Sequence, residues 1–364
     1  MTATNPSSSS PFVLRLAFHQ SNWRGHGGVH RTTQVVELLQ RTGLEVPPAP
    51  QPGASVKAPG SAQVLKKMLG TYLPAVKSAL GAQAEVWRFR KGLWENRHAK
   101  VMVWEDTKRH FPLHEARRRG LKVVAIPQNM ESFDRPDLPE GRQKVGALKG
   151  EIEALLEAHV IFALSREDTW FLRLFGATAF CLPYYPPSGL EAELLSIREA
   201  RTGRPATRFL LVGSAVHEST RLGLLEGLTW LREARKKVPF QLDVAGYGTE
   251  KLRGCADHPD FSIHGGVSQE QLVEMQRSAA GAIIHHSPYS GSLTRVCETL
   301  MAGIPVIANE DGARAAPYPG VHVYRDVDEL SQLLSTELAV PPLPPRPSRE
   351  EGRFVETLNG FVTG

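Results

Sequence analysis

Cysteine is scarce in this chain, which carries only three cysteines in 364 residues. Cys181, Cys255 and Cys297 lie far apart and have none of the paired spacings that bind zinc. The scarcity excludes a zinc ribbon and a disulfide-stapled scaffold, and it fits a protein of the reducing cytoplasm.

Long apolar runs are also missing. No stretch approaches the roughly 18–20 apolar residues that a membrane-spanning helix needs, which excludes an integral membrane protein. The first eleven residues do not have the charged-then-apolar order of a signal peptide, and we expect a disordered tail over 1–11. We therefore expect a cytoplasmic protein, with peripheral contact at the inner face of the membrane as an additional hypothesis.

Charge is divided unequally between the two halves of the chain. Residues 1–187 carry 25 Lys and Arg against 16 Asp and Glu, whereas residues 188–364 carry 18 against 22. A basic first half favours an anionic membrane or an acidic substrate as its partner. Nucleic acid is not expected, because no zinc-finger, basic-zipper or RNA-recognition signature accompanies the charge.

Short apolar runs alternate with helical stretches, a pattern typical of parallel α/β units. The length favours two domains. We expect an N-terminal Rossmann-like domain over 12–187, a linker over 188–207 and a second Rossmann-like domain over 208–338. The predicted strands cover residues 12–18, 100–104, 122–127, 159–165, 208–214, 240–246, 280–286, 304–309 and 321–324.

The tail, residues 339–364, has a composition of its own. Five prolines between 341 and 347 favour a stiff extended segment, and residues 349–362 resemble a helix. One interpretation is a rigid arm that carries the last helix back to the first domain. The other is a disordered linker with a frayed end.

The stretch HHSPYSGSLTRVCETLMAGIPVIANEDG (285–312) is the most informative. It predicts a strand, a Ser/Gly turn, a helix and a second strand. Leu293, Val296, Cys297 and Leu300 share one helix face, and Thr294, Arg295 and Glu298 share the other. Free backbone N–H groups at such a helix N-terminus suit a diphosphate; Arg295 adds a cation and Glu298 can accept from sugar hydroxyls. The alternative is an ordinary capped helix with a solvated polar face.

This stretch resembles the donor-site signature of the family 4 glycosyltransferases, in which the helix continues into a Glu-Ala-Met-Ala-x-Gly-x-Pro-Val-like run. Here that run is ETLMAGIPV (298–306). Other segments resemble the family in the expected order, so the resemblance covers about residues 12–330. They are RGHGGVHRTTQVVELL (24–39), IPQNMESF (126–133), FALSREDTWFLRLFGA (162–177), FLLVGS (209–214), LDVAGYG (242–248) and FSIHGGVSQEQLVEM (261–275).

The resemblance implies a GT-B fold and sugar transfer from a UDP or GDP donor to a glycan, lipid-linked or small hydroxyl acceptor. It also implies retention of configuration and no protein nucleophile. We expect no cofactor, and no metal either, because the helix N-terminus after Ser292 and the Arg295 side chain offer the positive charge that a metal would supply. Asn129 and Glu131 would orient the acceptor, unless they only cap a helix, while Arg295 and Glu298 would act on the donor. The expected donor-binding residues are Gly27, Gly28, Gly213, Ser214, Gly246, Gly265, Gly266, Ser290, Gly291, Ser292, Leu293, Thr294, Arg295 and Glu298.

The chain departs from the family pattern in three places. Ser290 replaces the first of two glutamates, Gln128 stands where a histidine is frequent, and Ser214 and Arg221 replace an Arg and Lys pair. These departures leave open a catalytically silent GT-B-like partner subunit. A dinucleotide-dependent dehydrogenase is a weaker alternative, because no Gly-x-Gly-x-x-Gly opens a strand–helix unit followed by an acidic residue.

Two further segments have competing interpretations. Residues 62–81 place apolar side chains at helical spacing beside lysines, which indicates either core packing or a peripheral membrane contact. The string Asp326-Val327-Asp328 has the form of a metal-binding pair. Its position between a strand and an acidic helical turn instead predicts that Asp326 is a helix N-cap.

Overall fold

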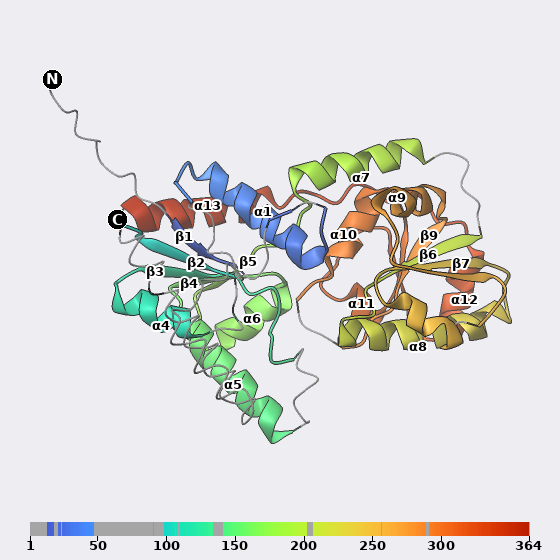
Figure 1. The fold of residues 1–364 in the computed structure, drawn as a ribbon, viewed down its shortest axis with the longest axis horizontal. Coiled ribbons are helices and arrows are strands. Elements are labelled where there is room, and N and C mark those ends of the chain that lie inside the picture. Colours follow the sequence, from blue (N-terminus) through green and yellow to red (C-terminus); the bar gives the residue numbers. More distant parts are fainter. Residues whose placement is uncertain are drawn as a thin grey trace, which may run out of the picture.

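The computed structural model describes residues 13–17, 21–22, 24–46, 90, 98–105, 107, 110–133, 141–201, 207–255, 257–288 and 291–363. The predicted amphipathic segment at 62–81 lies outside these residues. The chain forms two parallel sheets side by side, each with helices on its faces (Figure 1). The α/β architecture with two Rossmann-like domains, expected from the alternation of strands and helices, is confirmed.

The first sheet has the order β1-β2-β3-β4-β5. Its elements are β1 (Val13–Leu16), α1 (Gly27–Arg41), β2 (Val101–Trp104), α4 (Phe111–Arg118), β3 (Lys122–Ala125), α5 (Arg142–Leu156), β4 (Val160–Ala163), α6 (Arg166–Leu174) and β5 (Ala179–Cys181). Strands β2 and β4 are buried at every position. Such unbroken apolar strands form because helices cover both faces of a parallel sheet. Helices α4, α5 and α6 supply one core, and α1 supplies the other.

The second sheet has the order β11-β10-β9-β6-β7-β8. Its elements are α7 (Ser188–Ala200), β6 (Arg208–Val212), α8 (Glu218–Arg235), β7 (Gln241–Ala245), the 3₁₀ helix η1 (Thr249–Cys255), β8 (Phe261–Gly265), α9 (Gln269–Ser278), β9 (Gly281–Ile284), α10 (Thr294–Met301), β10 (Val306–Asn309), α11 (Glu310–Ala313), β11 (Val321–Tyr324) and α12 (Val327–Ser335). The strand order reverses between β6 and β9. In open parallel sheets the crevice beyond the carboxyl ends of the strands at this point is where ligands bind.

The segment 188–207 begins with helix α7. Its apolar side chains Leu190, Leu194 and Ile197 pack against Met301 and Ile304 of the second domain. Helix α7 therefore lies on the second sheet's side of the chain, next to α9 and α10 in Figure 1.

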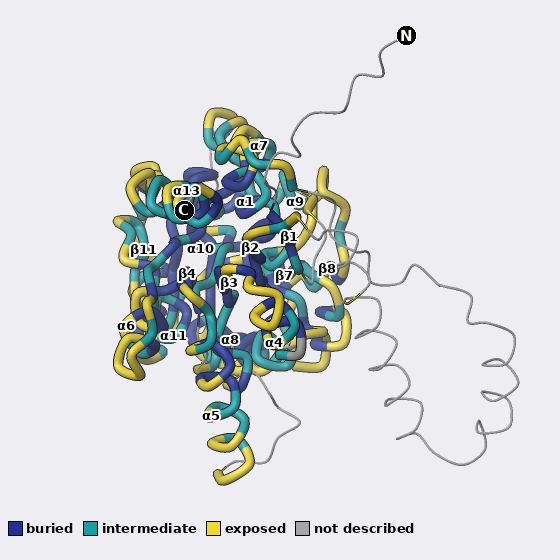
Figure 2. Tube along the Cα trace, turned by 90° about the vertical axis from the view of Figure 1, so that its left-hand side faces the viewer, coloured by how far each residue is buried: buried dark blue, intermediate teal, exposed yellow. Residues whose placement is uncertain are grey.

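The tail returns to the first domain, as the rigid-arm interpretation predicts. Residues 336–347 are extended, and α13 (Ser348–Thr363) lies beside α1 (Figures 1 and 2). Phe354, Leu358 and Val362 pack into the core that α1 shares with the first sheet. The alternative of a disordered linker with a frayed end is wrong, because this apolar stripe is buried on folding.

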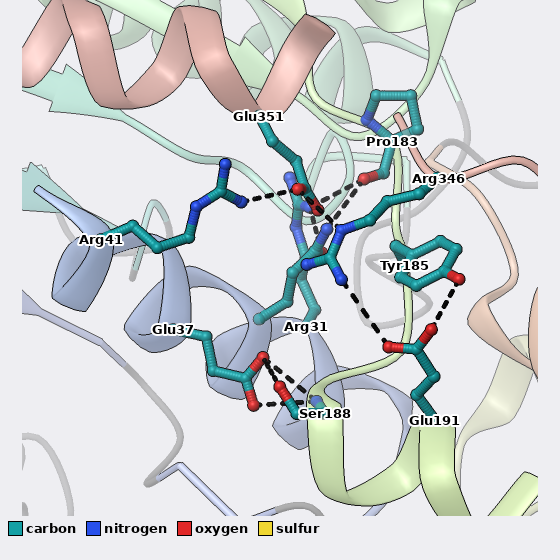
Figure 3. Close-up of polar contacts among 10 residues, drawn as sticks. Arg31, Glu37, Arg41, Pro183, Tyr185, Ser188, Glu191, Arg346 and Glu351 are labelled. Carbon is teal, nitrogen blue, oxygen red and sulfur yellow. Dashed lines mark hydrogen bonds and ion pairs between the residues drawn. The ribbon is translucent and has the colours of Figure 1, made fainter. Parts of the chain in front are cut away.

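We call residues 336–347 the strap. Polar contacts hold the strap in place where it joins α13 (Figure 3). Arg346 donates to Glu351 at 3.0 Å and forms an ion pair with Glu191 at 3.7 Å. Glu351 also accepts from Arg41 of α1 at 2.7 Å, and Glu191 accepts from the Tyr185 hydroxyl at 2.9 Å. The strap is thus bonded to both domains.

Within the part of the chain that the structure describes, no helix is both long and apolar enough to cross a membrane.

Candidate functional site

The N-termini of α1 and α10 meet where the carboxyl ends of the two sheets face each other. Helix α1 begins at Gly27, directly after the extended residue His26. A Cβ on Gly27 would lie 2.4 Å from the Thr294 hydroxyl oxygen, so only a glycine allows this approach. Gly28 accepts a long bond of 3.4 Å from the Gln128 side chain. Sequence-predicted residues of both domains therefore come together at one point.

The predicted two-faced character of α10 is confirmed. Val296, Cys297 and Leu300 are buried, and the N-cap residue Leu293 makes no side-chain capping bond. Arg295 turns the other way and donates to the Val212 carbonyl at 3.3 Å, at the end of β6. This places a guanidinium at the point where the strand order reverses, in the first turn of a helix whose N-cap residue makes no side-chain capping bond.

The turn before α10 is held from the first domain. Gly291 has φ +77°, and its Cβ would lie 2.6 Å from the Gln128 carbonyl oxygen, so a larger residue does not fit. Its N–H donates to the Asp168 carboxylate of α6 at 2.8 Å, and its carbonyl accepts from Arg314 at 3.0 Å. Burial raises the pKa of Asp168. The neighbouring Ser292 hydroxyl donates to a backbone carbonyl at 3.4 Å, and the predicted site residue Ser290 lies outside the described residues.

Glu298 lies between the two domains rather than open to solvent. Its carboxylate accepts from the Tyr184 hydroxyl at 2.6 Å and bonds His30 Nδ1 at 2.8 Å. Burial disfavours protonated His30, but the hydrogen bond and charge of Glu298 outweigh it and raise the His30 pKa. Burial and Glu298 also raise the pKa of Tyr184. The carboxylate is thus a shared acceptor for one group on α1 and one group after β5.

A pair of histidines also spans this interface. The rings of His26 and His217 are 6.4 Å apart, one before α1 and one before α8. Burial, together with the nearby His217 and His30, lowers the pKa of His26. His26 is therefore neutral over a wider pH range than His30, which lies four residues further along the chain.

The loops at the carboxyl edge of the second sheet carry the remaining predicted donor residues. Gly213 and Ser214 follow β6, and a Cβ on Gly246 after β7 would lie 2.0 Å from the Gly213 carbonyl oxygen. Gly265 ends β8 with φ +75°, and Gly266 packs beside the ring of Tyr247, which is 73% exposed. The structure brings these glycines to one edge, beside the switch point.

Asn129 and Glu131 lie in the turns after β3. Asn129 packs against Gly291, with its Cβ 3.2 Å from the position that a Cβ there would take. The backbone N–H groups of Glu131 and Ser132 donate to the buried Glu151 carboxylate of α5, at 2.7 and 2.8 Å. Asn129 therefore belongs to the interdomain contact, whereas Glu131 stands in a turn that Glu151 fixes.

No group of three or more His, Cys, Asp and Glu side chains with metal-binding geometry occurs in the described ranges. The Asp326 side chain accepts from the N–H groups of Asp328 and Glu329, which confirms the predicted helix N-cap.

No protein-family model matches the chain, and no curated protein sequence is similar to it. Solved structures with the same fold do exist. Sucrose-phosphate synthase from Thermosynechococcus elongatus is 14% identical, with 98% of this chain and 97% of that chain covered and a TM-score of 0.60. Trehalose 6-phosphate synthase from Burkholderia multivorans is 14% identical, with 97% and 94% covered and a TM-score of 0.63. Anabaena Alr3699/HepE in complex with UDP and glucose is 11% identical, with 98% of each chain covered and a TM-score of 0.55. These likenesses show that the chain has the GT-B fold.

Proposed function

We propose that the chain is a glycosyltransferase that moves a sugar from a UDP or GDP sugar to a hydroxyl acceptor, retaining configuration and using no metal or cofactor. In this reaction the bond from the anomeric carbon to the diphosphate breaks, and a bond from that carbon to the acceptor oxygen forms. The departing diphosphate takes the acceptor proton. Catalysis then depends mainly on stabilising the charge that develops on the diphosphate.

One observation carries this proposal: the uncapped N-terminus of α10, with Arg295, lies at the reversal of strand order and faces Gly27 at the start of α1. Two helix N-termini and a guanidinium that converge on one point attract a diphosphate. Glycine at 27 lets backbone N–H groups approach phosphate oxygens closely. The fold likeness to a structure that contains UDP and glucose supports the same conclusion.

The contact between Gly27 and Thr294 also sets a condition on donor binding. The two helix N-termini touch, so a diphosphate fits between them only after the domains separate. Separation breaks the bonds of Glu298 to His30 and Tyr184. We infer that Glu298 then accepts from the donor sugar hydroxyls, while Asn129 and Glu131 orient the acceptor.

The acceptor is proposed to be a glycan, a lipid-linked sugar or a small molecule, reached from a cytoplasmic membrane surface. Helix α6 offers a surface for such contact, because Trp170 and Leu174 are 64% and 62% exposed and Phe175 continues the stripe. Figure 2 shows α5 projecting nearby, with exposed residues along its free end. Exposed aromatic and aliphatic side chains on a basic domain are typical of proteins that bind anionic membrane surfaces.

The direct test is a screen of UDP and GDP sugars for slow hydrolysis and for transfer to alcohols, with NAD as a binding control. Arg295→Ala and Glu298→Ala should each lower turnover on the order of a hundredfold. Arg232→Ala and Glu233→Ala, on the outer end of α8, serve as matched controls and should leave turnover unchanged.

Near-wild-type turnover of both Arg295→Ala and Glu298→Ala would refute the site. UDP or GDP binding without turnover of any donor would instead favour a silent GT-B-like subunit. Binding of NAD alone would favour a dehydrogenase.

A further inference from the structure

The first turn of helix α1 lacks the negative charge that stabilises a helix N-terminus. Gly27, Gly28 and Val29 carry no charge, and no acidic residue lies in the turn. The positive end of a helix dipole is stabilised by nearby negative charge. His30, which ends this turn, instead adds an ionisable group of the opposite sign.

The His30 ring leans back along the helix towards its N-terminus. Helical side chains tilt in that direction, and the backbone of Gly25, two residues before the helix, hydrogen-bonds the ring. The residue is buried, with 7% of its surface exposed. The ring therefore lies beside the start of α1, where Gly27 meets the Thr294 hydroxyl of α10.

A carboxylate of the other domain balances this ring. Glu298 Oε1 lies 2.8 Å from His30 Nδ1 and also accepts from the Tyr184 hydroxyl at 2.6 Å. Glu298 lies about one turn after Thr294 on α10. His30 stands in the same relation to Gly27 on α1. Two successive turns of α10 thus contact two successive turns of α1.

The groups around His30 favour its protonated form. Burial disfavours the imidazolium, but the bond and charge of Glu298, a backbone hydrogen bond and the charge of Glu193 on α7 raise the His30 pKa. The nearby His26 has a lowered pKa, and the pKa of Tyr184 is raised, so both are uncharged near neutral pH. His30 is therefore cationic over a wider pH range than a free histidine.

Binding of a diphosphate between α1 and α10 takes Glu298 away from this ring. The contact between Gly27 and Thr294 leaves no room for a diphosphate until the domains separate. Separation breaks the bond between His30 and Glu298. An imidazolium beside a helix N-terminus that has lost its carboxylate is stabilised by another anion. The diphosphate is that anion, and it carries more negative charge than one carboxylate.

We propose that protonated His30 is a ligand of the donor diphosphate, supplied by the first domain opposite Arg295 of the second. This inference rests on the proposed function and adds a residue to it. Glu298 and the diphosphate compete for one ring: the carboxylate binds it while the domains are in contact, and the diphosphate binds it once the donor enters. One cation from each domain then lies on the diphosphate, where charge develops as the bond to the sugar breaks.

The test is titration calorimetry of the full chain with inorganic pyrophosphate, and with UDP and GDP in parallel. The reference is Glu298→Gln, which removes the competing charge and should bind pyrophosphate more tightly than the wild type. Adding His30→Gln should then weaken binding about tenfold at pH 6, because a hydrogen bond to a charged group is lost. If His30 served only to hold Glu298, this second substitution would change nothing once residue 298 is neutral.

The charge of the side chain gives a second readout. At pH 9 the effect of His30→Gln should shrink to about threefold or less, because the wild-type ring is then neutral. His30→Lys, in the same Glu298→Gln background, should keep its advantage over His30→Gln at both pH values. Comparing variants at one pH cancels the ionisation of pyrophosphate itself. His114→Gln, which removes an exposed histidine paired with Glu157, is the matched control and should not change binding.

Three results would overturn the inference: no saturable pyrophosphate binding to Glu298→Gln, equal affinity with and without His30 in that background, or a loss of the same size at pH 6 and pH 9. If circular dichroism shows that His30→Gln does not fold, His30→Asn takes its place. Pyrophosphate binding that depends on His30, without turnover of any UDP or GDP sugar by the wild type, would refute the transferase function instead and leave His30 as an anion ligand.

Discussion

Replacing Glu298 by glutamine should destabilise the protein, and more so in acid than in alkali. The side chains of His30 and Glu298 are only 10% and 16% exposed, and His30 Nδ1 lies 2.8 Å from Glu298 Oε1. A hydrogen bond to a charged group contributes about 1.5–3 kcal/mol, whereas a neutral one contributes about 0.5–1.5 kcal/mol. Glutamine keeps an oxygen that accepts from the Tyr184 hydroxyl, so the variant mainly removes the charge.

The direction of the pH dependence follows from His30. Its pKa is raised above 6.5 in the folded chain, so protonated His30 is stabilised relative to the unfolded chain. This contribution is fully present below the unfolded pKa and is lost as the pH rises through the folded pKa. We therefore expect Glu298→Gln to cost about 1.5–3 kcal/mol near pH 5 and about 1 kcal/mol or less near pH 9.

Urea unfolding of the wild type, Glu298→Gln, His30→Gln and the double variant at both pH values measures this effect. The double variant should lose little more than the larger single loss, because both variants remove the same bond. Glu233→Gln, which breaks an exposed pair with Lys236, is the control and should show no such pH dependence. An equal loss for Glu298→Gln at both pH values would refute the assignment of a charged His30–Glu298 pair.

Four other outcomes are expected. Gly291→Ala should cost about 1–2 kcal/mol in urea unfolding, because its φ of +77° disfavours any side chain; an unchanged midpoint would contradict the turn geometry. Asp326→Ala should lower the free energy of unfolding by about 1 kcal/mol through loss of the N-cap, and an unchanged free energy would show that the cap does not stabilise α12. Excess EDTA should leave donor turnover intact, so loss of activity that Mg²⁺ or Mn²⁺ restores would refute the metal-free mechanism. Anionic vesicles should bind the wild type weakly and release it in high salt, and Trp170→Ser with Leu174→Ser should weaken binding severalfold; equal binding to neutral vesicles would count against this surface.

The fold was predictable because local pattern and tertiary structure agree over most of the chain. Apolar runs bounded by turn residues marked nearly all strands of both sheets, and helical spacing identified the buried face of α10. Strand β5 was missed because it has only three residues at the edge of its sheet, which is too short for a periodic pattern. Strand β8 was anticipated only through the family resemblance.

The site was predictable only in part, since its key contacts join residues far apart in the chain. Tyr184 and Asp168 were not predicted, because their importance lies in bonds to Glu298 and to the Gly291 N–H across the interface. Glu151 was missed for the same reason: it accepts from a turn about twenty residues earlier. A buried acidic residue on an otherwise amphipathic helix was the available signal.

The carboxylates of Glu298 and Asp168 offset the positive charge where two helix N-termini meet at this interface. The positive ends of the α1 and α10 dipoles lie close together, and this arrangement is unfavourable without nearby negative charge. Glu298 supplies that charge from α10, and Asp168 supplies it at the Gly291 N–H. On the proposed function, the donor diphosphate provides the same charge once the domains separate, so donor binding and the interdomain bonds compete for one positively polarised site.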